Sequence, residues 1–226
     1  MTRRTSVILP TINGMEPWKR TLDICREAKR RKMEVCVALD DRTTDDTGKH
    51  VAPYVDRLLR VKNDTSYCEA VMNQLSDSTT GEWTFWLCDD EYPSDALWDF
   101  VASVHRLPHL IYRPRIVAPV PDWSGHYKPD ETLQPRIFPK DTMRWREGGM
   151  DILPMRSLPE RDIPQVLWHF TLWSPRPWRE AKAAYNDSEW MKSWAHHPFP
   201  PSSSKAYLWE DHRDQVTPLG DYEQYR

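Results

Sequence analysis

Three consecutive acidic residues are the part of the sequence that points most directly to chemistry. Asp89, Asp90 and Glu91 come one residue after the apolar run 83–87. Carboxylates gathered at the end of a strand are the hard oxygen ligands that Mg²⁺ and Mn²⁺ prefer. An ion held there can neutralise the charge that develops on a diphosphate leaving group. The alternative interpretation is a solvated acidic turn that precedes and caps a helix.

A second acidic pair ends another apolar run. Asp40 and Asp41 close the segment 35–39. An acidic side chain at a strand end can accept hydrogen bonds from a nucleobase or a ribose. The threonines and aspartates within residues 43–47 are also common helix caps, so this signal is weak when it stands alone.

Strand-like and helix-like segments alternate through about the first 105 residues. This alternation predicts an α/β fold with a mainly parallel sheet and helices on both faces. Ligands of such sheets bind beyond the carboxyl ends of the strands, so Thr11, Asn13 and the two acidic groups should converge on one edge. The expected strands are residues 6–10, 35–39, 57–61 and 83–87, and the expected helices lie within 18–28, 68–75 and 94–104.

Taken in this order, three segments resemble the family 2 inverting glycosyltransferases of the GT-A fold. They are SVILPTIN, ALDDRTTDDT and TTGEWTFWLCDDEYPSDAL. The resemblance implies a Rossmann-like sheet, a nucleoside diphosphate sugar as donor, with a UDP-sugar as the first expectation, and Mn²⁺ or Mg²⁺. It also implies contacts with the donor by Pro10, Thr11, Asn13, Asp40, Asp41, Asn73, Asp89, Arg136 and Lys182.

The acidic turn departs from the family pattern at one position. The first Asp of the family's D-x-D pair falls on Cys88, which leaves Asp89 as the candidate for its role. Asp90 aligns with the residue that binds the metal directly, and Glu91 is a further candidate metal ligand. His169, on the expected strand 166–172, is either a further neutral metal ligand or a histidine of the core.

The second half of the chain resembles the family more loosely and is rich in proline and tryptophan. Matching elements are Pro129-Asp130, Gln134 to Phe138, Trp145 to Gly148, Val166 to Phe170, and Lys182 with Tyr185. An inverting transfer needs a carboxylate that takes the proton of the attacking acceptor. The resemblance implies Glu147 or Asp151 for this base, with Glu160 and Asp162 as more distant alternatives.

The length of 226 residues suits one large domain. We expect a GT-A domain over residues 1–186, with a nucleotide-sugar half at 1–105 and an acceptor-side half at 106–186. A helix is expected to start near Ser174 and to run through Lys182. Residues 187–226 are expected to form a wrapping tail.

Composition narrows the classes of partner. A net charge of -3 gives no bulk attraction to nucleic acid. The four cysteines lack metal or disulfide spacing and are expected to be reduced and buried. No 18-residue apolar stretch is present, so we expect no membrane span and, by analogy with bacterial and phage enzymes, a cytoplasmic location.

Two other interpretations stay open at this point. A non-catalytic sugar- or nucleotide-binding protein that retains the GT-A fold is the main alternative, because Cys88 replaces a family aspartate. A nucleotidyltransferase fits less well, because the segment after the first strand is not rich in glycine and basic residues. The acceptor is not readable and could be a glycan, a protein or a modified nucleobase, although the charge does not indicate nucleic acid.

Overall fold

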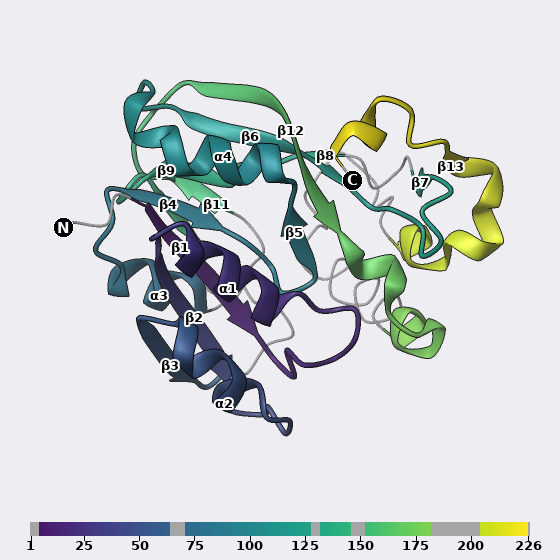
Figure 1. Ribbon diagram of the computed structural model, residues 1–226, viewed down its shortest axis with the longest axis horizontal. Helices are drawn as coiled ribbons and strands as arrows, with labels where there is room; N and C mark the ends of the chain where they lie inside the picture. Colours follow the sequence, from purple (N-terminus) through teal and green to yellow (C-terminus); the bar gives the residue numbers. More distant parts are fainter. Residues whose placement is uncertain (1–4, 64–70, 128–131, 146–151, 182–203, 226) are drawn as a thin grey trace, which may run out of the picture.

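A nine-stranded mixed sheet forms the centre of the computed structural model (Figure 1). Its strand order is β3-β2-β1-β4-β9-β6-β12-β5, and β8 pairs with β6. The strands are β1 (Thr5–Thr11), β2 (Glu34–Asp40), β3 (Arg57–Val61), β4 (Trp83–Trp86), β5 (Glu91–Pro93), β6 (Ile111–Val117), β8 (Thr132–Leu133), β9 (Ile137–Pro139) and β12 (Glu160–His169). The structure describes residues 5–63, 71–127, 132–145, 152–181 and 204–225.

The first half of the sheet is parallel. Strands β3, β2, β1 and β4 are neighbours in this order, and each pair runs parallel. They are the four strands that the apolar runs predicted. The α/β class and the mainly parallel start of the sheet are therefore confirmed.

The second half of the sheet mixes directions. Strand β9 runs antiparallel to both β4 and β6, β12 runs parallel to β6, and β5 runs antiparallel to β12. The predicted strand 166–172 starts earlier, at Glu160, and ends at His169. It ends there because the chain turns into a 3-10 helix, Phe170–Trp173. The backbone N–H of Phe170 still donates to the carbonyl of Asp90, at 2.6 Å.

Helices cover both faces of the sheet. On one face lie α1 (Thr21–Arg30) and α4 (Asp95–Ser103), and on the other lie α3 (Met72–Ser78) and a hairpin of β10 (Met143–Trp145) with β11 (Ile152–Pro154). The short α2 (Thr47–Val51) follows β2. Helix α1 begins later than predicted, at Thr21, because residues 12–20 form a loop. Among the described helices, none combines the length and the apolar character needed to cross a bilayer.

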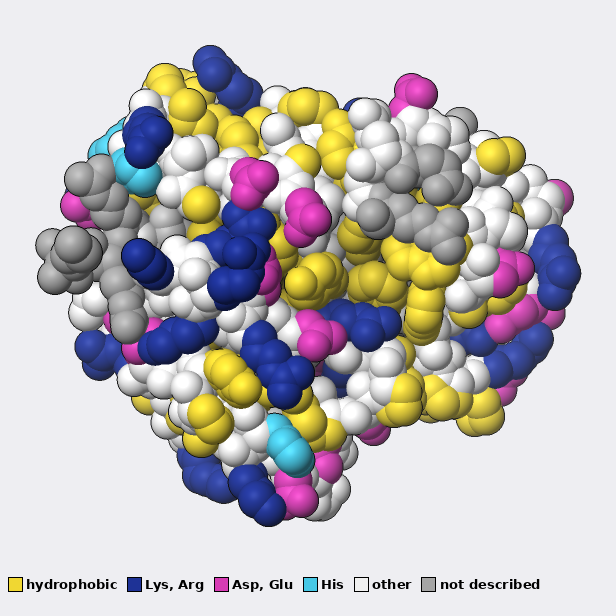
Figure 2. All heavy atoms as spheres, viewed as in Figure 1, with side chains coloured by type: hydrophobic (Ala, Val, Ile, Leu, Met, Phe, Trp, Pro, Cys, Tyr) yellow, Lys and Arg dark blue, Asp and Glu magenta, His cyan; other side chains and the backbone are white. Residues whose placement is uncertain are grey.

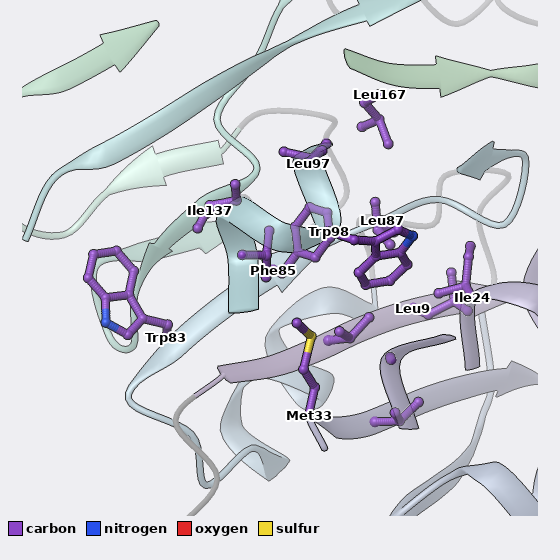
Figure 3. Packing of buried hydrophobic residues seen from close by; sticks show 14 of the residues in the cluster. Leu9, Ile24, Met33, Trp83, Phe85, Leu87, Leu97, Trp98, Ile137 and Leu167 are labelled. Carbon is purple, nitrogen blue, oxygen red and sulfur yellow. The ribbon is translucent and has the colours of Figure 1, made fainter. Parts of the chain in front are cut away.

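Alternating residues of each strand fill two cores, one on each face. Leu9 and Phe85 pack with Ile24 of α1 and Trp98 of α4, as Figure 3 shows. Their neighbours Ile8 and Trp86 point the other way and pack with Leu75 of α3. Burial on both faces is what a parallel sheet between helices requires, and it explains the nearly continuous apolar runs of the sequence.

The C-terminal segment 204–225 packs against the end of β12. Strand β13 (Val216–Thr217) pairs with β7 (His126–Tyr127), and Leu219 joins an apolar cluster with Trp168. The indole N–H of Trp168 donates to the carbonyl of Tyr225 at 3.1 Å. The buried guanidinium of Arg179, in the helical segment 176–181, donates two hydrogen bonds to Glu210.

The buried carboxylate of Glu34 links β1, β2 and the segment before β4, at the end of these strands opposite the acidic turns. Glu34 at the start of β2 accepts the hydroxyl of Ser6 at 2.5 Å, the hydroxyl of Thr80 at 2.9 Å and the backbone N–H groups of Thr80 and Gly81. Burial by itself would raise the pKa of this carboxyl group. The hydrogen bonds outweigh burial and hold the pKa below its ordinary value of 4.5.

We predict that Glu34→Gln lowers the free energy of unfolding by about 1–3 kcal/mol at pH 7, because buried donors lose an ionised acceptor. The folded-state pKa is lowered, so this contribution is present above pH 4.5 and is lost as the pH falls through the folded-state pKa. Urea unfolding of both proteins between pH 3 and pH 7 measures it, with the exposed Glu82→Gln as control. Parallel pH profiles of wild type and Glu34→Gln would contradict the assignment.

Candidate active site

The ends of β1, β2 and β4 bring the acidic groups of the sequence to one edge. In the parallel register Thr11 lies opposite Leu39, and Ile8 lies opposite Trp86. The hydroxyl of Thr11 donates to Asp89 at 2.8 Å. The acidic turn after β4 is therefore tied directly to the end of β1.

Asp89 is also held by the loop that follows β1. The ammonium group of Lys19 lies 3.0 Å from its carboxylate and also donates to the carbonyl of Ile12. The backbone N–H of Arg20 donates to the carbonyl of Asp89 at 2.6 Å. Lys19 has only 7% of its side chain exposed, so its charge acts inside the site and not in bulk water. The sequence interpretation gave neither Lys19 nor Arg20 a role in the site, although two basic residues in the loop after the first strand were a readable signal.

Asp90 and His169 face each other across the junction of β5 and β12. The Nε2 atom of His169 lies 3.4 Å from Oδ2 of Asp90. The side chain of His169 is 22% exposed, and that of Asp90 is 11% exposed. The antiparallel pairing of β12 with β5, which sets His169 opposite Glu91, creates this approach. Two of the three predicted metal ligands are thus neighbours, with their polar atoms within reach of one small ion.

Glu91 uses both carboxylate oxygens inside the turn. One accepts from the guanidinium of Arg136 at 2.5 Å, and the other accepts the backbone N–H of Cys88 at 2.8 Å. The guanidinium of Arg136 also lies 3.8 Å from the centre of the Trp86 ring. The ion pair between Glu91 and Arg136 thus stabilises the turn. Across the described ranges, no group of three or more His, Cys, Asp or Glu side chains is arranged to hold a metal ion.

The carboxylate of Asp40, at the end of β2, accepts hydrogen bonds from the side chain and the backbone of Arg42. Arg42 donates to both oxygens of Asp40, at 2.8 and 2.5 Å, and its backbone N–H donates at 2.9 Å. Burial raises the pKa of Asp40, but the bonds from Arg42 outweigh it and lower the pKa below its ordinary value. Asp41 next to it is exposed, and its backbone N–H donates to the carbonyl of Val61. Asp41 is thus the more accessible of the two carboxylates.

The loops after β1 and β2 are clasped together. The side-chain oxygen of Asn13 accepts the backbone N–H of Thr44 at 2.8 Å, and Asp45 accepts the backbone N–H of Met15 at 3.0 Å. Asn13 adopts a φ of 48°, a left-handed conformation that asparagine tolerates better than most residues. This clasp forms a polar rim above the carboxyl ends of β1 and β2.

Two other predicted donor-binding residues have structural neighbours. Pro10 is buried within β1. Asn73 on α3 donates from its amide nitrogen to the carbonyl of Trp145 at 2.8 Å, and its oxygen accepts the N–H of Trp145 at 3.0 Å. Asn73 therefore fastens β10 to α3 in this structure, and its contact with a donor stays a prediction.

The candidate bases divide into two groups. Glu147, Asp151 and the predicted donor-binding Lys182 lie outside the described residues. Glu160 and Asp162 lie in the first part of β12 and are ion-paired with Arg113, at 2.8 and 2.7 Å. Seven or more residues separate them from His169 on the same strand, which is more than about 20 Å at roughly 3.3 Å per residue. They are too far away to serve this site.

The fold and this edge together define a glycosyltransferase of the GT-A fold. The family model described as "Glycosyl transferase family 2" matches residues 6–157. The chain belongs to this family. No curated protein matches the chain by sequence.

Solved structures of S. aureus TarS support the fold. S. aureus TarS is 15% identical, with a TM-score of 0.52, covering 92% of this chain and 42% of that one. TarS 1–349 in complex with UDP is also 15% identical, with a TM-score of 0.50 and coverage of 92% and 70%. The mannosyltransferase PcManGT from Pyrobaculum calidifontis, in complex with GDP-Man and Mn²⁺, is 17% identical, with a TM-score of 0.49 and coverage of 94% and 70%.

A glycine in the loop after β1 permits the contact between Thr11 and Asp89. A Cβ atom on Gly14 would lie 2.5 Å from the hydroxyl of Thr21 and 2.7 Å from that of Thr11. Both threonines are buried, so neither can move aside easily. The loop can therefore close over the end of β1 only with glycine at this position.

We predict that Gly14→Ala lowers the free energy of unfolding by about 1–3 kcal/mol, because the added methyl group overpacks a filled site. Gly48→Ala in α2 is the matched control. Its new Cβ would lie 3.0 Å from Cδ2 of Leu39 and 3.9 Å from the guanidinium of Arg60, which is less crowded than at Gly14, so its effect should stay within about 1 kcal/mol. Urea unfolding of both variants measures the difference, and equal stability of the two would refute the crowding at Gly14.

Proposed function

We propose that the protein transfers a sugar from a nucleoside diphosphate sugar to an acceptor, with inversion at the anomeric carbon and with help from a divalent cation. The observation that carries this proposal is the approach of Asp90 and His169, at 3.4 Å, beside the Asp89 turn. The family membership supports sugar transfer in general. The cation, the inversion and the acceptor are the parts that we add.

The pair fits Mn²⁺ or Mg²⁺ held jointly with a substrate. Magnesium sites at phosphates commonly use one or two carboxylates, and the substrate and water supply the other ligands. Carboxylate oxygens suit Mg²⁺ and Mn²⁺, whereas an imidazole nitrogen suits later metals, so the mixed pair favours Mn²⁺ over Mg²⁺. Asp90 and His169 would hold the ion, which when bound neutralises charge on the departing diphosphate.

The other residues of the edge would position the donor. Asp89, fixed by Thr11 and Lys19, presents a carboxylate beyond the end of β4, and Lys19 adds a positive charge beside it that would suit a phosphate. Asn13 in the polar rim and the exposed Asp41 nearby in the chain offer acceptors for a ribose or a base. TarS 1–349 was solved with UDP, which makes UDP the first nucleotide to test.

The transfer step needs one carboxylate as a base. An acceptor oxygen attacks the anomeric carbon, the bond from this carbon to the diphosphate oxygen breaks, and the acceptor proton moves to the carboxylate. Glu147 and Asp151 are the candidates for this base. The nucleoside diphosphate leaves with the electron pair of the broken bond.

We predict that UDP raises the melting temperature only when Mn²⁺ or Mg²⁺ is present. A ligand at 100 times its dissociation constant adds about 2.7 kcal/mol to stability. Asp90→Asn should abolish the shift and His169→Gln should reduce it, whereas Asp77→Asn, an exposed aspartate on α3, should leave it unchanged. Thermal denaturation with UDP, with and without excess chelator, gives the answer. An equal shift in chelator would exclude the metal.

We predict that Glu147→Gln or Asp151→Asn lowers turnover by roughly 100- to 10,000-fold, because the base acts in the chemical step. Nucleotide affinity should change little. Asp162→Asn, at the far end of β12, serves as the control and should keep normal turnover. Steady-state rates with an identified donor and acceptor, together with nucleotide titrations, measure both quantities. Near-normal turnover of both variants would place the base elsewhere.

Binding and turnover also separate the enzyme from a binding protein with the same fold. A non-catalytic protein would show metal-dependent UDP binding without donor hydrolysis or transfer. Release of UDP from UDP-sugars in the presence of Mn²⁺, compared with Asp90→Asn, distinguishes the two.

A further inference from the structure

A cavity of about 520 Å³ lies on the α1 face of the sheet. Figure 2 shows a hollow near the centre of this face, with apolar side chains gathered on one side and charged ones beside them. Its volume falls in the range of about 300–1,000 Å³ that is typical of small-molecule sites. The lining residues are Arg20, Asp23, Arg26, Glu27, Arg30, Tyr92, Trp123, Phe170 and Trp173.

The two walls of this cavity differ in chemistry. Helix α1 and Arg20 before it supply the charged wall, and four aromatic rings supply the other. The aromatic wall is firmly built: Trp123 packs edge-on against Phe170 and Trp173, with ring centres 6.0 and 5.8 Å apart. A pyranose ring has an apolar C–H face and a polar rim of hydroxyl groups. Its C–H face can therefore stack on the aromatic wall, and its hydroxyl groups can bond to the charged wall.

Trp123 adopts a backbone conformation that tryptophan rarely takes. Its φ is 60°, in the left-handed region, and its N–H closes a turn onto the carbonyl of Val120 at 2.9 Å. Strain of this kind is concentrated at functional sites, where the surrounding structure enforces it. The strained turn is what brings the Trp123 ring into the wall of the cavity.

The guanidinium of Arg20 lines the cavity and lies against two aromatic rings. Its guanidinium carbon lies 4.5 Å from the centre of the Phe170 ring and 5.7 Å from that of Trp173. Its Nε atom is buried and has no hydrogen-bond acceptor, and no carboxylate pairs with Arg20 within the described ranges. Arg30, by contrast, donates two hydrogen bonds to Glu27. The lining as a whole carries one positive charge in excess.

We infer that this cavity binds an anionic saccharide, a pyranose ring that carries a carboxylate or a phosphate, with its anionic group on Arg20. An anion on the ligand would pair with the guanidinium of Arg20 through a charge-assisted hydrogen bond. The aromatic wall then stacks on the sugar ring. A simple inorganic anion would leave this wall unused.

The position of the cavity connects this ligand to sugar transfer. Arg20 and Phe170 line the cavity with their side chains and hold Asp89 and Asp90 with their backbone N–H groups, at 2.6 Å each. A saccharide bound here contacts the residues that flank the acidic turn. Its assignment as the acceptor rests on the proposed function, whereas its binding does not.

Direct binding tests the inference with three sugars and one ion. Tryptophan fluorescence titrations, in excess chelator and without nucleotide, would use glucuronic acid, glucose 6-phosphate, glucose and inorganic phosphate. The two anionic sugars should bind at least tenfold more tightly than either glucose or phosphate. Equal affinity for glucose, or phosphate binding as tightly as glucose 6-phosphate, would overturn the inference.

Variants locate the binding site. Arg20→Gln should remove the advantage of the anionic sugars, and Arg20→Lys should keep part of it. Arg113→Gln, outside the cavity and paired with Glu160 and Asp162, should change affinity by less than threefold. Equal effects of Arg20→Gln and Arg113→Gln would overturn the assignment to Arg20. Melting temperatures confirm that each variant is folded before it is titrated.

UDP titrations with Mn²⁺ on the same samples separate the two proposals. Anionic sugars that bind without metal while UDP does not bind would refute the donor site alone. UDP binding with no discrimination among the sugars would refute this cavity alone. Displacement of the anionic sugars by UDP would place them in the donor site and would also overturn the inference.

Discussion

Two backbone hydrogen bonds hold the acidic turn between the halves of the molecule. Arg20, at the end of the loop after β1, donates to the carbonyl of Asp89, and Phe170, just after β12, donates to the carbonyl of Asp90. The turn is thus fixed by segments that are about 150 residues apart in the chain. Because these bonds use main-chain atoms, they do not themselves occupy the carboxylates of Asp89 and Asp90.

The buried ion pair of Glu91 and Arg136 also stabilises this turn. Glu91 and Arg136 are 2% and 4% exposed, and their contact is as short as 2.5 Å. Burying such charges is costly unless the pair is close. The N–H of Cys88 fills the second oxygen of Glu91. Cys88 therefore takes part in the turn through its backbone N–H.

Much of the fold could be predicted because buried parallel strands produce continuous apolar runs. All four runs of the first half form the predicted strands, and the polar residues after them meet at one edge. The mixed half could not be predicted in this way. Strand β9 is only three residues long, and its pairing with β4 and β6 depends on contacts far away in the sequence.

The candidate site was predictable where a motif marked it and not where tertiary contacts decide it. Asp90 and His169 were both named from the sequence, but their approach depends on β12 pairing with β5. The role of Lys19 depends on how the loop after β1 folds back onto Asp89. Conversely, both ends of the Asn73 amide are bound to Trp145, a contact that no local pattern reveals.

The docking of the C-terminal segment has a consequence for how the protein is made. Trp168, next to His169, is covered by Leu219 and bound through its indole to Tyr225. During synthesis the parallel half emerges first and can begin to pack, since folding on the ribosome proceeds from the N-terminus. The strand that carries His169 gains its outer cover only after Tyr225 has left the ribosome. A nascent chain stalled before Leu219 would thus have a largely formed sheet and an uncovered strand β12.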